Sequence, residues 1–264
     1  MILIRRCEGF DELEACVQMQ VETWGYDPSD VIPRKVFKVA QKIGGQVIGA
    51  FDTELPGALP EGGPESMVGF VFSLPGVKTG QDEPRPYFHS HMLAVREAYR
   101  NRGLGARLKL EQRQEALGRG IRLMEWTFDP LEIKNAYLNI EKLGAIARRY
   151  NVDQYGITSS PLQGSLPTDR LVAEWWMKSK RVEAVLAHAP RAKFECRASI
   201  DVPAEIYEWK AAAATRAQAL AVQGSNRERF NRSFADGLSV LGYERDKQGN
   251  GRFLLGEWDE AWRY

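Results

Sequence analysis

The sequence predicts an α+β fold built on a largely antiparallel sheet, and three observations carry this prediction. Strand candidates at residues 46–51 and 67–74 are separated by a loop rich in Pro and Gly, which is typical of an antiparallel meander. Residues 87–95 have the alternating pattern of a further strand. They lead through a glycine-bearing turn into an amphipathic helix that we expect over residues 104–117.

The composition fits a globular protein with a large core. The chain has 264 residues, of which 44% are apolar and 27% charged, so wholesale disorder is excluded. This length suggests one large domain or two small ones. We expect an α+β domain over residues 1–178 and a smaller α/β segment over residues 179–264, because the pattern loosens after Tyr150.

Charge and cysteine content narrow the class of protein further. The net charge of +1 offers no global basic field, so we expect neither nucleic acid nor membrane as a partner. No apolar run approaches the ~20 residues of a membrane span, and the first residues do not resemble a signal peptide. Cys7, Cys16 and Cys196 are scattered and lack zinc-ligand spacing. We therefore expect reduced thiols, no metal and a cytoplasmic location.

The remaining elements follow from start and stop signals. A strand is expected over residues 1–7, then a helix that Asp11 caps and Gly25 ends, and a second helix from Pro33 to Lys42. Later elements alternate strands and helices. They are a strand at 121–128, a helix at 131–143, a strand at 170–177, a helix at 179–188, a strand at 192–202, helices at 204–222 and 225–238, and a hairpin of 242–245 with 251–255.

The alternation over residues 87–95 assigns side chains to the two faces of that strand. One face is expected to carry His89, His91, Leu93 and Val95. The other is expected to carry Phe88, Ser90, Met92 and Ala94.

A glycine motif, Arg100-x-x-Gly103-x-Gly105-Ala106, stands between this strand and the helix that follows. Glycines permit close backbone approach, and the first amides of a helix have no intrahelical partner, so the turn predicts an anion site. Residues 96–122 hold eight basic and three acidic side chains, which favours a diphosphate ligand. The alternative is a helix start whose glycines only permit tight packing. The spacing excludes a nucleoside-triphosphate loop and a dinucleotide fingerprint.

The motif resembles the pyrophosphate-binding motif of the GNAT acyltransferase superfamily. Asn135-Ala-Tyr-Leu-Asn-Ile-Glu-Lys-Leu-Gly144 resembles a second motif of that superfamily, and the resemblance, to a bacterial branch, covers residues 1–178. It implies a mixed, mostly antiparallel sheet flanked by helices, in which parallel strands at 87–95 and 121–128 splay apart. It also implies acetyl-CoA or another acyl-CoA, such as succinyl-CoA, as cofactor.

The resemblance further implies which residues hold the cofactor. Backbone groups near Leu93 and Val95 would pair with the pantetheine arm, and amides of the glycine turn would hold the pyrophosphate, with charge from Arg100 or Arg102. The full expected set is Leu93, Ala94, Val95, Arg100, Asn101, Arg102, Gly103, Leu104, Gly105, Ala106, Asn135 and Asn139. Asn139 lies one helical turn beyond Asn135, so we expect both on the same side.

A general base is expected at His89 or His91. Some members of the superfamily have a Glu thirteen residues before the motif's Arg-Gly pair, and this count from Arg102 leads to His89. Histidine titrates near neutral pH, which suits a base for an amine. The alternative is a pair of strand histidines bound to backbone or to each other. The superfamily's Tyr general acid is replaced by Ile140, so that assignment stays open; Tyr137 and Tyr150 are better explained as packing residues.

These residues predict an acyl-CoA-dependent N-acyltransferase whose acceptor is a small-molecule amine or an amino acid. Two alternatives stay open, namely a coenzyme A-binding protein without transferase activity and a protein lysine acetyltransferase. A homodimer is compatible with the sequence. The role of residues 179–264 is not indicated.

Overall fold

The computed structural model describes residues 1–79, 83–156 and 158–263, which form two compact units, Met1–Met124 and Glu125–Tyr264. The expected boundary at residue 178 falls inside the second unit and stays a prediction. None of the helices in the described ranges has the length and apolar character needed to cross a membrane.

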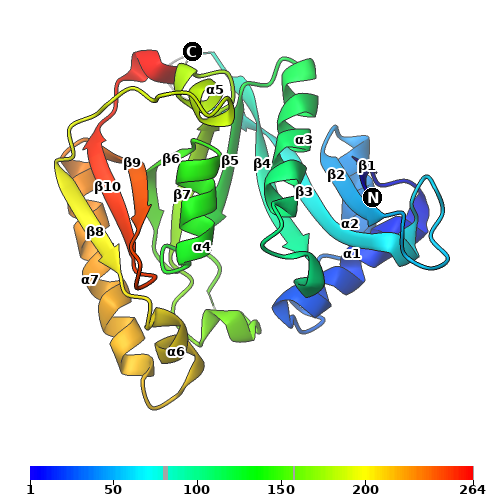
Figure 1. Ribbon diagram of the computed structural model, residues 1–264, viewed down its shortest axis with the longest axis horizontal. Coiled ribbons are helices and arrows are strands. Elements are labelled where there is room, and N and C mark those ends of the chain that lie inside the picture. The colour runs from blue at the N-terminus through cyan, green and yellow to red at the C-terminus, as the bar shows by residue number, and fades with distance from the viewer. Residues whose placement is uncertain (80–82, 157, 264) are drawn as a thin grey trace. The chain divides into compact units, whose positions relative to one another are not determined.

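The first unit is an antiparallel meander between two layers of helix (Figure 1). Strands pair in chain order, as the Pro and Gly loops predict. They are β1 (Ile2–Arg6), β2 (Gln46–Asp52), β3 (Met67–Lys78) and β4 (Arg85–Val95). The helices are α1 (Gly9–Trp24), α2 (Arg34–Lys42) and α3 (Leu104–Gly118). Strands β3 and β4 are longer than expected, because cross-strand pairing continues beyond Pro75, which lies opposite Phe88.

Each face of this sheet has its own apolar core. The cluster under α1 and α2 includes Phe37 of α2 with Phe70 and Phe72 of β3. The Phe37 ring meets these two rings edge-on, at centroid distances of 6.0 and 4.8 Å. The cluster under α3 contains Val71, Val95, Leu104 and Leu108 with further strand residues. The helix predicted from residue 104 therefore packs on the face opposite to α1 and α2.

The strands of the second unit follow the order β5-β7-β6-β9-β10-β8, and β6 pairs antiparallel with β7 and with β9. Its strands are β5 (Leu123–Phe128), which begins in the last two residues of the first unit, β6 (Ile146–Asn151), β7 (Arg170–Trp176), β8 (Ala198–Val202), β9 (Leu238–Arg245) and β10 (Gly251–Glu257). Its helices are α4 (Ile133–Ala136), α5 (Lys180–Leu186), α6 (Ile206–Ala211) and α7 (Arg216–Ala235). The predicted hairpin is confirmed as β9 and β10.

Helix α7 differs from the sequence prediction, because it runs unbroken through Gly224 where two helices were expected. Packing outweighs the intrinsic cost of that glycine: Gln223, Asn226 and Phe230 are all buried. The guanidinium of Arg227 donates to the fully buried Asp169 at 2.8 and 3.0 Å. This ion pair connects helix α7 to the residue that precedes β7.

Candidate functional site

A β-bulge in β4 changes which face each of its side chains occupies. Met92 lies opposite Phe72 and Ser90 lies opposite Ser73, so His91 is the extra residue between them. Ser90 hydrogen-bonds to α3 side chains, whereas Met92 packs in the cluster under α1 and α2. The expected grouping of Ser90 with Met92 is therefore wrong.

The same bulge places both histidines on the face covered by α1 and α2. His89 lies opposite Leu74, which packs against that cluster, and paired residues share a face. The His91 ring meets Phe72 of the same cluster edge-on, with centroids 6.1 Å apart. Leu93 and Val95 pack on the α3 side. The sequence grouped all four residues on one face, because a regular alternation cannot anticipate an inserted residue.

The two imidazoles lie close together and half-buried, with ring centroids 5.9 Å apart. Neither has a hydrogen-bond partner among residues 1–79, 83–156 and 158–263, in contrast to the alternative of strand histidines bound to backbone. Burial lowers the pKa of His89 most, and the coulombic effects of His91, Lys109 and Lys78 add to this, so that its pKa is about 4. Burial also lowers the pKa of His91. Both rings are therefore neutral at neutral pH and able to accept a proton.

A buried polar network behind β4 was not anticipated from the sequence. The Lys109 ammonium of α3 donates to Ser90 Oγ at 2.7 Å, and Ser90 Oγ donates to Gln112 Oε1 at 2.9 Å. Gln46 Nε2 donates to the Gln112 carbonyl at 3.0 Å. Burial lowers the pKa of Lys109 well below its ordinary value. From the sequence, a Lys at position 109 of an amphipathic helix is expected to be a solvated charge. No sequence signal therefore predicts this network.

Backbone groups of Leu93 and Val95 face the edge of β4 that points away from β3. The Arg96 amide donates across to Val68 O at 2.9 Å, and successive residues of a strand direct their backbone groups to opposite edges. Arg100 Nε reaches Val95 O at 2.9 Å, which agrees with this assignment.

The glycine turn presents a run of amides at the start of α3. Gly103 is the N-cap residue, with a left-handed φ of 76°, and Asn101 is also left-handed at 61°. The Arg100 amide donates to Glu97 O at 3.1 Å, so this amide is not available to a ligand. The amides of residues 101–106 have no acceptor in the part of the chain that the structure describes. They lie at the positive end of a helix of 15 residues, where negative charge is stabilised, so the expected anion site has suitable donors at this position.

The two arginines of the motif have different surroundings. Arg100 is directed back to the Val95 carbonyl, whereas the guanidinium of Arg102 lies 5.9 Å from the Tyr99 ring centroid. The Tyr99 hydroxyl donates to Asp52 at 2.7 Å, which fixes that ring. Asn101, Arg102 and Gly103 are exposed, Gly105 and Ala106 are half-buried, and Leu104 is buried in the core under α3.

The second expected motif lies in the second unit and departs from a regular helix. Residues Tyr137–Lys142 form a π-helical turn after α4, and the Leu143 amide donates to Leu138 O, five residues earlier. Asn135 is exposed and Asn139 is buried, and their expected placement on the same side stays a prediction. Ile140 is fully buried. Among the described residues, no group of three or more His, Cys, Asp or Glu side chains could hold a metal ion.

Comparison with known proteins identifies the fold. No protein-family profile and no curated protein matches the sequence. NAA60 of Arabidopsis thaliana in complex with a bisubstrate analogue matches with a TM-score of 0.52 and 18% identity, over 67% of this chain and 98% of that chain. The same protein in complex with acetyl-CoA matches with a TM-score of 0.51 and 16% identity, over 67% and 99%. The ribosomal-protein-S18-alanine N-acetyltransferase from Escherichia coli gives 0.48 and 16%, over 68% and 97%.

Because the identities are low, this likeness shows the fold alone. The chain has the fold of the GNAT N-acetyltransferases, a mixed and mostly antiparallel sheet flanked by helices, and the expected fold class is confirmed.

Proposed function

We propose that this protein is an acyl-CoA-dependent N-acyltransferase that acylates a small-molecule amine or an amino acid. The observation that carries the proposal is the run of amides over residues 101–106, which have no acceptor among the described residues and stand at the N-terminus of α3. The fold supports it, because the Arabidopsis protein that shares this fold was solved in complex with acetyl-CoA. This likeness covers 67% of the chain.

The residues of the glycine turn fit a pyrophosphate group. A Cβ atom added to Gly103 would meet no heavy atom within 4 Å, so the space over this residue is open. A Cβ on Gly105 would lie 3.5 Å from Leu93, within ordinary contact. The amides of residues 101–106 and the exposed guanidinium of Arg102 would hold the diphosphate. The backbone groups of Leu93 and Val95, which point away from β3, would pair with an amide-bearing arm, as a further strand would.

His91 and His89 are the candidate bases. Acyl transfer to nitrogen requires a neutral amine, and an imidazole that is neutral at pH 7 can accept the proton that the ammonium gives up. Their lowered pKa values keep both rings in this form and also make them weaker bases. His91 is the better candidate, because burial alone lowers its pKa, whereas coulombic effects of His91, Lys109 and Lys78 also lower that of His89. A donor amide near Leu93 would stabilise negative charge on the carbonyl oxygen as the amine adds.

The thiolate leaves without a tyrosine acid at position 140, because the fully buried Ile140 supplies no proton. The same feature is the observation in favour of the second candidate function, a coenzyme A-binding protein without transferase activity. A protein lysine acetyltransferase is the third candidate function. It differs from the proposed function in its acceptor, which is a lysine of a peptide instead of a small-molecule amine.

Binding and turnover test the proposal in sequence. We expect free coenzyme A, acetyl-CoA or succinyl-CoA at about 100 times its dissociation constant to raise the melting temperature by about 5–10 °C, from roughly 2.7 kcal/mol of linkage. Gly103→Glu should abolish this shift, because it places bulk and negative charge at the anion site. Gly120→Glu is the matched control. Gly120 also has a left-handed φ, of 74°, and a Cβ atom added to it would meet no heavy atom within 4 Å, but it lies beyond the opposite end of α3.

The outcomes separate the candidates. A shift that Gly103→Glu removes and Gly120→Glu retains supports the site, and release of coenzyme A on adding amino acids or simple amines supports the transferase. Binding without release in any amine or peptide screen favours the binding protein. Equal shifts in both variants would contradict the site assignment.

A further inference from the structure

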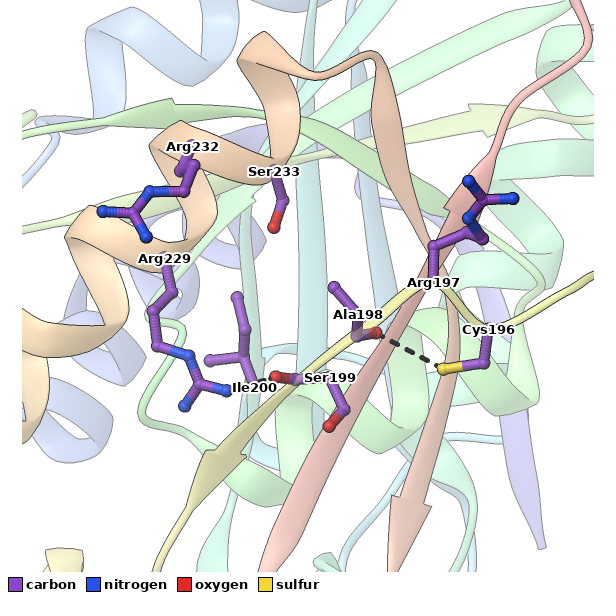
Figure 2. A pocket seen from close by; sticks show the side chains of 8 residues that line it. All are labelled: Cys196, Arg197, Ala198, Ser199, Ile200, Arg229, Arg232 and Ser233. Carbon is purple, nitrogen blue, oxygen red and sulfur yellow. Dashed lines mark hydrogen bonds between the residues drawn. The ribbon is translucent and has the colours of Figure 1, made fainter.

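A pocket of about 470 Å³ lies wholly within the second unit, between β8 and the C-terminal half of α7 (Figure 2). Three arginines line it, namely Arg197 before β8 and Arg229 and Arg232 on α7. Arg229 and Arg232 are three residues apart, which places them on neighbouring positions of one helix face. Not one acidic side chain lines the pocket in the described part of the chain.

The positive charge of this pocket is not neutralised by the protein. Arg229 Nη2 donates to the Ser199 carbonyl at 2.5 Å, and a neutral carbonyl leaves the guanidinium charge intact. The Arg232 side chain has neither an ion pair nor a hydrogen bond with any of residues 1–79, 83–156 and 158–263. Arg197 lies 3.3 and 4.0 Å from Glu195 and Glu257, but both carboxylates are more than three-quarters exposed, so solvent screens these pairs.

A hydroxyl group points into the same space. The Ser233 residue is 8% exposed, and Figure 2 shows its side chain directed from α7 toward Ala198 and Ile200 on β8. Within the described ranges, its Oγ has no hydrogen-bond partner, and it is not one of the fully buried polar atoms that lack a partner. The hydroxyl is therefore accessible and can donate to a ligand in the pocket.

We propose that this pocket binds a phosphorylated small molecule. Guanidinium groups bind phosphate oxygens through paired, charge-assisted hydrogen bonds, and three of them without a lining acid favour a ligand with at least two negative charges. The Ser233 hydroxyl adds a donor for the remaining oxygens. The volume exceeds that of a phosphate ion, and the buried Ile200 gives an apolar wall for the organic part of the ligand. This site is separate from the glycine turn and does not depend on the proposed transferase activity.

Cys196 provides a local reporter for this pocket. It lines the pocket and is exposed, whereas the other two cysteines, Cys7 and Cys16, are buried. The probe is inorganic pyrophosphate, and the readout is the rate of Cys196 alkylation by iodoacetamide, followed by peptide mass spectrometry at constant ionic strength. We expect 5 mM pyrophosphate to slow alkylation of the wild-type chain at least fivefold. Pyrophosphate bound at the glycine turn would leave this rate unchanged, because the reporter lies in the second unit.

Variants assign the protection to the arginines. Arg232→Gln should reduce it to less than twofold, and Ser233→Ala should reduce it partially. Arg252→Gln is the matched control, because it removes one exposed arginine of the same unit whose partner is Asp201, outside the pocket. This control should keep full protection. Arg232 is exposed and has no partner within the described residues, so its substitution does not threaten folding; an unchanged melting temperature verifies this.

Three results would overturn the proposal. Pyrophosphate that does not slow alkylation of the wild-type chain would mean that the arginines are solvated surface charges, with Arg229 serving only to cover the edge of β8. Equal protection in Arg232→Gln and Arg252→Gln would show a non-specific salt effect. Protection by citrate at the same concentration, equal to that by pyrophosphate, would assign the pocket to polycarboxylates instead of phosphates.

Discussion

The lowered pKa of His89 makes a quantitative prediction about stability. Its imidazole titrates near pH 6.5 in an unfolded chain and at about 4 in the folded protein. The unfolded chain therefore binds the proton more readily, so stability is complete above about pH 6.5 and is lost as the pH falls toward 4. At about 1.4 kcal/mol for each unit, the full loss is about 3 kcal/mol, of which about 2 kcal/mol is lost between pH 7 and pH 5.

His89→Gln removes this titration and should flatten the pH dependence. We expect the free energy of unfolding of the wild-type chain, from urea denaturation, to fall by about 2 kcal/mol more than that of the variant between pH 7 and pH 5. His188→Asn, at an exposed turn, is the control for loss of an imidazole and should follow the wild type. The chain has only three histidines, so NMR titration of the ring protons measures the same pKa directly.

A His89 signal that titrates near pH 6.5 would refute this reasoning. It would mean that water reaches the ring freely and that the bulge does not bury it against the α1–α2 face. An equal pH dependence in wild type and His89→Gln would lead to the same conclusion.

Three further predictions concern catalysis and packing. His91→Ala should lower kcat at neutral pH at least tenfold while the affinity for the acyl donor, from calorimetry, changes less than twofold; wild-type turnover would exclude the base. Phe37→Ala should cost about 3–5 kcal/mol of unfolding free energy, since its ring is fully buried, whereas Val39→Ala at an exposed position should cost less than about 1. Asp169→Asn should cost about 3–5 kcal/mol in urea denaturation, because it leaves the Arg227 guanidinium without its carboxylate; a cost below about 1 would contradict that role.

Local signals predicted the fold and the start of α3 well, whereas the anion site stays a prediction. The meander follows from strand periodicity and from Pro and Gly in the loops, and these operate over a few residues. The start of α3 at Leu104 follows from Gly103, whose left-handed conformation disfavours other residues. Strand periodicity, turn residues and a left-handed glycine are local properties of a few neighbouring residues, so they can be recognised in the sequence alone.

Features set by pairing between distant segments escaped prediction. The bulge at His91 exists because β3 and β4 pair with one residue extra on β4, and no composition signal marks it. Helix α7 passes Gly224 because burial on one side outweighs its helix propensity. The arginine pocket requires the strand after residue 197 to lie beside α7, a contact between segments that are about thirty residues apart.

The bulge also has a consequence for the proposed chemistry. It puts the histidines on the face of β4 under α1 and α2, whereas the glycine turn leads into α3 on the opposite face. A single ligand can reach both only by passing the edge of β4, where the backbone of Leu93 and Val95 is directed away from β3. Under the proposed function, the anion site fixes one end of the acyl donor, the strand edge aligns its arm, and the base acts from the other face. An acceptor amine then approaches from the α1–α2 side, so the residues that select it belong to that face.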